Sequence, residues 1–576
     1  GVYYAQYGYA NLSDFSNWSK LSALQNRSCN TICYFQGNLL ANTIKNYSNT
    51  NSITDSLFVV KNNALNSFPG NFYQITKITS KDDKLVIVNI NDVTLYNSEL
   101  KLLQQTDLKK IDASFCTDAL LDDDGTLWIS TLNYGLINSK TLSSYKPTSP
   151  NADNVSSIDY RNNLLYVSYG TRYTFRNSRI SIFQFYDGNW INSLDWSSLD
   201  AYKIIAYPDE NYHFFVGTLT GIYEGDSWGK INNHFYKNSI LSNSLIANEY
   251  IGIQSMEFDG NKNLFTTAIE KGYLYCFSNN KEWGIMKYSE FINPILMTID
   301  KNNNLWIAFM PAGKSIVSSL AIINYNNTVT NTTDDEVNII PFKESSGEMI
   351  AENATCAKID NNDVLWIGTS AGILYYPNAS SATSDNSPVI YRNKVEIDGV
   401  VDYLLSSESI TCIEIDAANR KWVGTNTGVY VISSDGTSVV EHYNTQNSPL
   451  PSNTIYSIKI IPEKSLAYIG TQNGLISYKM RIKPASENLD NISVYPNPVE
   501  TRYEGTITIE GLMDNSTVSI SDVSGNLVYR TNSEGGVAFW NGKNLEGNKV
   551  ASGVYIVVCI SEDGLQKNIT KIIINK

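Results

Sequence analysis

The feature that most constrains the fold is a repeat that runs from Asp122 to Tyr478. Each copy has a turn rich in Asp, Asn and Gly, a strand centred on an aromatic residue, a second turn and a further strand. Clear copies are DDDGTLWISTLNYGL, DNNDVLWIGTSAGILYY and DAANRKWVGTNTGVYVI. The eight central aromatic residues are Trp128, Tyr166, Phe215, Phe265, Trp306, Trp366, Trp422 and Tyr468. Their spacing of about 40 to 60 residues is close to the length of one β-propeller blade.

The residues within each copy favour β-structure. Before the turn stand β-branched, alternating segments such as ITCIEID, which are typical of a strand packed on its neighbours. Asp and Asn hydrogen-bond their own backbone and Gly accepts positive φ, so the turn closes readily. The aromatic residue offers a large area for burial, and we expect the following Gly to permit a close approach. One blade cannot bury both of its faces, so the blades must form a ring.

The motif Leu-Trp-Ile-Gly-Thr and the string NSPLPSNTIYSI, from Asn447 to Ile458, resemble the two-component-regulator propeller repeat. That resemblance covers about residues 110–480 and implies the fold, but sensors, secretion proteins and secreted cargo all carry the repeat. Fainter copies begin at Asp55 and Asp82. We therefore expect residues 1–112 to be the remaining blades of a first, N-terminally incomplete propeller. Residues 113–482 are expected to form a second propeller of seven to eight blades.

The repeat ends after YKMRIKPASENLD, and residues 483–576 have a different pattern. Short segments of strand-forming residues alternate with turns such as SDVSGN, which is typical of a β-sandwich. The expected fold class is therefore all-β, with β-propellers followed by a C-terminal Ig-like β-sandwich. Seven strands are expected, around Val494, Ile507, Ile520, Val528, Ala538, Ile556 and Ile573.

Several strings of this last domain resemble proteins of the Bacteroidetes type IX secretion system. VYPNP at Val494–Pro498, DVSG at Asp522–Gly525 and ASGVYIV at Ala551–Val557 resemble its type A C-terminal domain, an export signal of cargo. In combination, RYEGTITIEGL, NSTVSISDVSGNLVYR, SEGGVAFWNGKN and VASGVYIV resemble the PorZ family. This second resemblance implies a non-enzymatic, outer-membrane-associated component at the cell surface, exported through the periplasm. The implied partners are the sortase PorU, PorV, PorQ and anionic lipopolysaccharide, which the protein would present to the sortase that anchors cargo.

Two other functions remain open from the sequence. The chain could be secreted cargo that binds or degrades polysaccharide, in which case the export signal after about Asp490 is removed. It could also be the periplasmic half of a two-component sensor, although such chains continue into a membrane helix and a kinase. The ending in a sorting-type sandwich favours the first two functions over the third.

Composition excludes further classes of protein. The net charge of -14 and the lack of Lys and Arg clusters argue against a nucleic-acid-binding protein. No apolar window long enough for a transmembrane segment is present. The opening GVYYAQYGYA lacks the features of a signal peptide and reads like the end of a repeat, so we expect a longer parent chain.

We predict no catalytic, cofactor-binding or metal-binding residues, because no hydrolase, zinc-protease, nucleotide-binding or thiol-redox motif occurs. His213, His234 and His442 have no partners at ligand spacing and are expected at the surface or in packing. The seven scattered cysteines are not a disulfide framework, and the pair Cys29 and Cys33 is expected to be buried thiols, with a bridge between them left open. DDDG at Asp122–Gly125 favours a hairpin over a calcium loop. Trp190, Trp196, Trp228 and Trp283 lie outside the repeat centres and are the candidates for an exposed platform that stacks on sugars.

Overall fold

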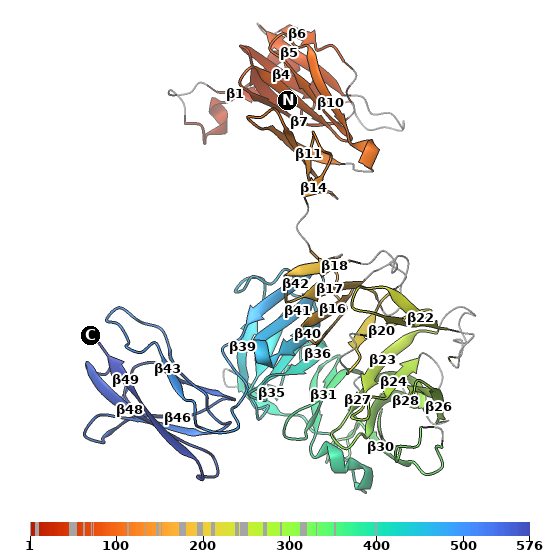
Figure 1. Ribbon diagram of the computed structural model, residues 1–576, viewed down its shortest axis with the longest axis vertical. Helices are drawn as coiled ribbons and strands as arrows, with labels where there is room; N and C mark the ends of the chain where they lie inside the picture. Colours follow the sequence, from red (N-terminus) through yellow and green to blue (C-terminus); the bar gives the residue numbers. More distant parts are fainter. Residues whose placement is uncertain are drawn as a thin grey trace. The chain divides into compact units, whose positions relative to one another are not determined.

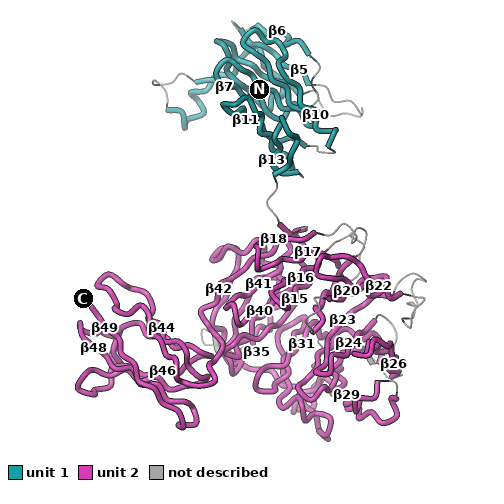
Figure 2. Tube along the Cα trace, in the orientation of Figure 1, with its two compact units in different colours: residues 1–148 teal, residues 149–576 magenta. Residues whose placement is uncertain are grey.

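The chain folds into two compact units, residues 1–148 and 149–576 (Figure 2). The computed structural model describes residues 2–575 with these positions excepted: 6–7, 9–10, 45–54, 62–63, 71, 73, 112–114, 133, 146–148, 151, 172–179, 193–199, 209–212, 237–240, 242–250, 269–272, 289–290, 312–318, 330, 351–352 and 398–399. Nearly all regular structure is β, which confirms the expected fold class. Within the described segments, no helix is both long and apolar enough to cross a bilayer.

The described residues of the first unit form three four-stranded antiparallel sheets and one short two-stranded sheet. The short sheet pairs β1 (Tyr3–Tyr4) with β2 (Ser19–Lys20). The others are β3 (Ile32–Phe35), β4 (Asn38–Thr43), β5 (Ser56–Lys61) and β6 (Ala64–Ser67); β7 (Ile75–Lys81), β8 (Lys84–Asn89), β9 (Asp92–Tyr96) and β10 (Leu102–Asp107); and β11 (Cys116–Leu121), β12 (Leu127–Thr131), β13 (Gly135–Asn138) and β14 (Ser144–Tyr145).

The three larger sheets pack face to face in chain order, as propeller blades do. β3 contacts β7, and β11 contacts both β7 and β8. Val86 and Val88 of β8 share a buried cluster with Leu127 and Ile129 of β12. The boundary expected from the sequence falls after residue 112, yet the blade β11–β14 beyond it belongs to the first unit because its buried face is covered by β7 and β8.

The second unit contains a ring of seven blades (Figure 1). Each blade is an antiparallel sheet in which the strands follow one another in chain order, and in the described residues the fifth and seventh have three strands. The first four blades are β15 (Ser157–Arg161), β16 (Leu164–Ser168), β17 (Ile180–Gln184) and β18 (Asn189–Ile191); β19 (Lys203–Ala206), β20 (Phe214–Thr218), β21 (Gly221–Gly225) and β22 (Ile231–Phe235); β23 (Ile253–Phe258), β24 (Leu264–Ala268), β25 (Tyr273–Phe277) and β26 (Trp283–Lys287); and β27 (Phe291–Ile299), β28 (Leu305–Pro311), β29 (Ser319–Asn324) and β30 (Glu336–Pro341).

The last three blades complete the ring. A separate hairpin, β34 (Lys394–Ile397) and β35 (Val400–Tyr403), stands between the fifth and sixth blades in the chain. The three blades are β31 (Ala354–Ile359), β32 (Leu365–Thr369) and β33 (Gly372–Tyr376); β36 (Ile410–Ile415), β37 (Lys421–Thr425), β38 (Val429–Ile432) and β39 (Val439–Tyr443); and β40 (Ile455–Ile461), β41 (Leu466–Thr471) and β42 (Gly474–Lys479).

The ring closes where the last blade meets the first. The first strand of each blade contacts the first strand of the next, and β40 contacts β15. The repeat glycine of β41 explains the fit, because a Cβ on Gly470 would lie 2.4 Å from Val155 Cγ1, just before β15. Gly424 lies against Ile455 in the same manner, with a distance of 2.8 Å. The glycine thus makes room for a β-branched side chain of the following blade.

The repeat turn owes its shape to one aspartate. In the fifth blade, Asp360 Oδ1 accepts from the backbone N–H of Asn362 and Val364, and Oδ2 accepts from Trp366 Nε1 at 2.9 Å. The sixth blade repeats the last bond between Asp416 and Trp422 at 3.0 Å. The carboxylate therefore closes the hairpin and fixes the aromatic ring at once, which explains why Asp precedes Trp at constant spacing.

The C-terminal domain is a sandwich of two sheets with all seven expected strands. Its buried core includes Val518, Ile520, Trp540 and Val557. One sheet has the order β43 (Ser493–Tyr495), β44 (Ile507–Glu510) and β47 (Val537–Trp540), and the other β46 (Leu527–Asn532), β45 (Thr517–Ser521), β48 (Gly553–Ile560) and β49 (Lys567–Ile574).

Candidate functional site

The candidate site is a cavity of about 460 Å³ lined by the first strands of the seven ring blades. Because these strands surround the ring axis, the cavity is the central channel of the propeller. Such a channel is a common binding position, since every blade contributes side chains to it.

One layer of this channel is set by the register of the repeat. In each blade, a channel-lining residue pairs across the first hairpin with the central aromatic residue, as Lys358 pairs with Trp366 and Glu414 with Trp422. Five of the seven members are charged. In ring order they are Asp159, Ile205, Glu257, Thr298, Lys358, Glu414 and Lys459.

Two ion pairs join neighbouring blades within this layer. Lys459 Nζ lies 2.8 Å from Asp159 Oδ1, and Lys358 Nζ lies 3.5 Å from Glu414 Oε2. Asp159 Oδ2 also accepts from the backbone N–H of Ala206 at 2.8 Å. The layer therefore ties the seventh, first and second blades together through a single carboxylate.

The channel stabilises the charged forms of these groups. Burial opposes the charge on Asp159, but Lys459 and the N–H of Ala206 outweigh it and hold its pKa below the usual value. Burial likewise opposes the charge on Lys459, while Asp159 and Glu414 raise its pKa. The pKa of Lys358 is raised chiefly by Glu414. At neutral pH the channel thus presents both cationic donors and anionic acceptors, which suits a polar, hydroxylated ligand.

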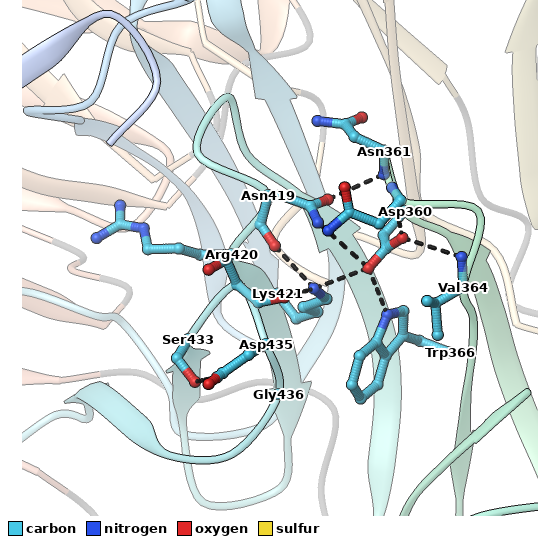
Figure 3. Close-up of polar contacts among 12 residues, drawn as sticks. Asp360, Asn361, Val364, Trp366, Asn419, Arg420, Lys421, Ser433, Asp435 and Gly436 are labelled. Atoms are coloured by element: carbon cyan, nitrogen blue, oxygen red, sulfur yellow. Dashed lines mark hydrogen bonds and ion pairs between the residues drawn. The ribbon is translucent and has the colours of Figure 1, made fainter. Parts of the chain in front are cut away.

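A second polar cluster lies between the fifth and sixth blades (Figure 3). Lys421 Nζ lies 2.9 Å from Asp360 Oδ2, and both side chains are at most 1% exposed. Lys421 also donates to the backbone oxygen of Asn419 and lies 4.7 Å from the centre of the Trp366 ring. Burial opposes the charge on Asp360, yet Lys421 and Trp366 hold the pKa of that carboxyl below its usual value. Because this cluster has no opening to solvent, it joins the two blades and does not serve as a ligand site.

The three histidines lie apart in the ring: His234 is in β22, His442 is in β39, and His213 directly precedes β20. His213 Nδ1 lies 3.0 Å from Glu224 Oε1. His234 stacks on Tyr223 with ring centroids 3.8 Å apart, and His442 stacks on Tyr430 at 3.9 Å. His234 and His442 thus contribute to packing between paired strands, and His213 makes a polar contact. Within the described segments, no group of three or more His, Cys, Asp or Glu side chains is arranged to hold a metal ion.

The other singled-out residues have local roles. Asp122–Gly125 forms a hairpin turn, with the Gly125 N–H donating to Asp122 O. The cysteines are free thiols, so Cys29 and Cys33 form no bridge; contrary to expectation, these two are half-buried, as are Cys356 and Cys412, and only Cys116, Cys276 and Cys559 are buried. Trp228 is 69% exposed, as a platform residue must be, whereas Trp190 and Trp283 are half-buried against Phe183 and Phe277. Trp196 lies outside the described residues.

Sequence reasoning missed the charged channel layer, although a signal for it was present. Each member is the residue of the first strand that pairs with a repeat aromatic, so its position follows from the repeat once the hairpin register is known. The sequence does not tell which of these residues become ion-pair partners, because that depends on the order of blades around the ring.

Comparisons with known proteins agree with this architecture. The family model described as "Secretion system C-terminal sorting domain" matches residues 493–575, which form most of the sandwich. The search of curated protein sequences gave no match. Among solved structures, virginiamycin B lyase from Staphylococcus aureus is 14% identical, with 58% of this chain and 94% of that chain covered and a TM-score of 0.39.

The structure of PorZ from Porphyromonas gingivalis, an essential bacterial surface component of its type IX secretion system, covers 96% of this chain. The alignment covers 82% of the PorZ chain at 22% identity, with a TM-score of 0.74. Identity at this level establishes the fold and leaves function to be argued from the sites. The chain therefore combines a PorZ-like fold with a secretion-system C-terminal sorting domain.

Proposed function

We propose that this protein is a non-enzymatic component of a type IX secretion system at the cell surface. The observation that carries the proposal is the likeness to PorZ over nearly the whole chain, from the first unit to the sorting domain. A protein that merely borrowed the sorting domain as a label would need to resemble PorZ only after about residue 483. Here the propeller ring and the preceding unit are also part of the likeness.

The partners are proposed from the same likeness to PorZ. We infer that the protein associates with the outer membrane, with the sortase PorU and with PorV and PorQ. Its ligand would be anionic lipopolysaccharide, presented as the acceptor to which the sortase joins cargo. A rigid seven-bladed ring suits presentation, because it holds a glycan in place while the partner performs the chemistry. We also propose that the three sheets of residues 1–148 are blades of a first propeller.

The joint between ring and sandwich supports a retained sorting domain. The backbone N–H of Gly536 donates to Lys483 O, and the N–H of Ser486 donates to Leu512 O. Ile482 is buried with Ala418 and Val537, and Leu489 is part of the sandwich core. Asp490 is exposed, but the backbone beside it is bound to the sandwich: the Leu489 N–H donates to Gln566 Oε1, and Asn568 Nδ2 donates to Leu489 O, whereas a protease needs an extended and free segment.

Secreted cargo is the second candidate, and the sorting domain itself favours it, since that domain also fits a plain export signal. The two functions differ in the fate of the segment after about Asp490. Mass spectrometry of the mature surface protein should find the peptides of residues 493–575 in a secretion component and should not find them in cargo.

Capture experiments test the component directly. The full chain, bound to beads, should retain PorU and anionic lipopolysaccharide from solubilised outer membrane. Retention of neither would refute the proposal, and turnover of a glycan by the purified protein would favour cargo with enzymatic activity.

A further inference from the structure

A pocket of about 210 Å³ lies between the second and third ring blades, separate from the channel. Its floor is aromatic. Phe215 and Phe277, each less than 8% exposed, meet edge to face with ring centroids 5.7 Å apart, and Tyr207 lies 6.1 Å from Phe215. An apolar floor with polar walls is the usual composition of a sugar-binding pocket, because one face of a sugar ring exposes only C–H groups.

Hydrogen-bonding groups stand on the wall of this pocket. Glu224 and His213 are joined by their 3.0 Å contact, and the Glu224 side chain is only 12% exposed. The Tyr207 hydroxyl donates to Asn279 Oδ1 at 3.1 Å. Carboxylate, imidazole and amide groups together provide acceptors and donors for sugar hydroxyls.

Two lysines, Lys262 and Lys281, complete the wall. Neither ammonium group has an ion-pair or hydrogen-bond partner within the described part of the chain. Both lysine side chains are exposed at the rim of the pocket. They leave a positive site open to an anion.

The backbone at both lysines is unfavourable for that residue type. Lys262 has φ of 66° and Lys281 has φ of 64°, in the left-handed region that favours Gly, Asn and Asp. At the position that matches Lys262, the fourth and sixth blades have Asn303 and Asn419, with φ of 66° and 58°.

Lys281 likewise occupies a turn position where other blades have a residue type that tolerates positive φ. The second and sixth blades have Gly229 and Gly436 at the matching position, both with φ of 73°. The third blade therefore places lysine at two strained turn positions, and both turns border one pocket. Leu100, Leu142 and Leu405 also have positive φ in turns, so the lysines are set apart by the pairing of two such turns at one pocket and not by φ alone.

We propose that this pocket binds one negatively charged sugar unit, with Lys262 and Lys281 holding its carboxylate or phosphate. The sugar ring lies against the partly exposed ring of Tyr207, above the buried Phe215 and Phe277, and its hydroxyls bond with Glu224, His213 and Asn279. The inference rests on the proposed function, because it locates the charged unit of the glycan that the protein would present.

The most direct test replaces Lys262 and Lys281 with the residues that other blades have at the matching turn positions. The double variant Lys262→Asn, Lys281→Gly removes both charges and places at each turn a residue that tolerates positive φ. Its midpoint of thermal unfolding should therefore equal or exceed that of the unaltered chain. Its affinity for a charged sugar should nevertheless fall at least tenfold. The matched control Lys287→Gln, Lys301→Gln makes the same change in charge outside the pocket and should leave the affinity unchanged.

The probes are galacturonate oligosaccharides, glucose 6-phosphate and neutral glucose, titrated into the full chain and followed by ligand-observed NMR. Tighter binding of the galacturonates identifies a carboxylated unit, and tighter binding of glucose 6-phosphate identifies a phosphorylated one. Equal binding of glucose, binding of no probe, or an unchanged affinity in the double variant would overturn the pocket assignment.

Lipopolysaccharide capture separates this inference from the proposed function. If the unaltered chain and the double variant capture anionic lipopolysaccharide equally, the pocket assignment fails while the proposed function stands. If charged sugars bind the pocket but the unaltered chain captures no lipopolysaccharide, the proposed function fails while the pocket remains.

Discussion

The blade β11–β14 of the first unit and the sixth blade of the ring, β36–β39, contain the same motif in different surroundings. Trp128 and Trp422 occupy the same register, and each indole N–H donates to the aspartate that closes the turn. Trp422 is 1% exposed because Tyr478 and Ile458 of the next blade cover it. Trp128 is partly exposed and borders an open apolar surface with Leu120 and Leu136, which are 68% and 40% exposed.

The difference shows that the motif has two separable tasks. The aspartate, the turn and the strand pairing form within one blade, whatever stands beside it. Burial of the aromatic residue requires the face of a following blade. Substitutions that act within a blade should therefore have similar effects in both places, whereas substitutions at the blade interface should have large effects in the ring alone.

The largest expected difference comes from removing the aromatic residue. Trp422→Ala should lower the free energy of unfolding of the ring by about 5 kcal/mol, because it leaves a large cavity between two blades. Trp128→Ala should lower that of the first unit by about 1 to 2 kcal/mol, since less area is lost from contact. Native-state hydrogen exchange with mass spectrometry reads the two units separately. Equal losses would mean that the face of Trp128 is covered as well.

The turn aspartate comes next. Asp360→Asn leaves Lys421 buried without its charged partner and should destabilise the ring by about 3 kcal/mol. Asp122→Asn, in the exposed turn of the first unit, should change the free energy of unfolding by less than about 1 kcal/mol. Hydrogen exchange in β31–β33 and β11–β14 measures both.

Adding Lys421→Leu to Asp360→Asn should recover most of the lost stability, because Leu305 and Leu365 occupy the matching position in two other blades. Failure of this rescue would show that the loss arises within the Asp360 turn and not from the unpaired ammonium group.

Ring closure gives an intermediate effect. Gly470→Ala places a methyl group against Val155 and should cost about 2 kcal/mol by overpacking the contact between the last and first blades. Val155→Ala in the same chain should relieve part of that cost. Ser130→Ala, at the matching position of β12, should change stability by under about 1 kcal/mol. Thermal unfolding followed by exchange in β15 and β40 checks this, and additive effects of Gly470→Ala and Val155→Ala would argue against direct contact.

The smallest effect is a dependence on pH. Asp159 has a lowered pKa, so its stabilisation is present above its unfolded pKa of 3.8 and is lost as the pH falls through the lower folded value. Lys459 has a raised pKa, so its contribution is present below 10.5 and is lost as the pH rises through the higher folded value.

The double variant Asp159→Asn, Lys459→Gln should therefore flatten both limbs of the ring's stability curve, by about 1 kcal/mol each. The matched variant Lys77→Gln, Asp118→Asn removes an ion pair of the first unit whose side chains are both 46% exposed, and it should leave that unit's curve nearly unchanged. Chemical denaturation between about pH 2 and 12 enters both limbs and distinguishes the two results.

Much of this architecture could be predicted from single residues in the sequence. The seven strands of the sandwich were all expected, and so were the turn residues and the aromatic centres of the blades. The residues of the candidate site were harder to predict from the sequence. Lys358 and Glu414 look like ordinary alternating polar residues of two strands, and they become ion-pair partners only because β31 and β36 are neighbours in the ring. Nothing in the sequence pattern distinguished Lys262 and Lys281 from other lysines. Only the structure shows that both have a left-handed backbone conformation in turns beside one pocket.

The sequence by itself determined the blade, because hairpin turns, strand alternation and the Asp–Trp bond are interactions between residues close along the chain. It also determined the sandwich and its likeness to a sorting domain. Only the tertiary structure decided which blades share a ring, and so placed Trp128 in the first unit and Tyr166 in the second. The reason is that ring membership depends on contacts such as that of Gly470 with Val155, which join residues far apart in the chain and leave no local pattern.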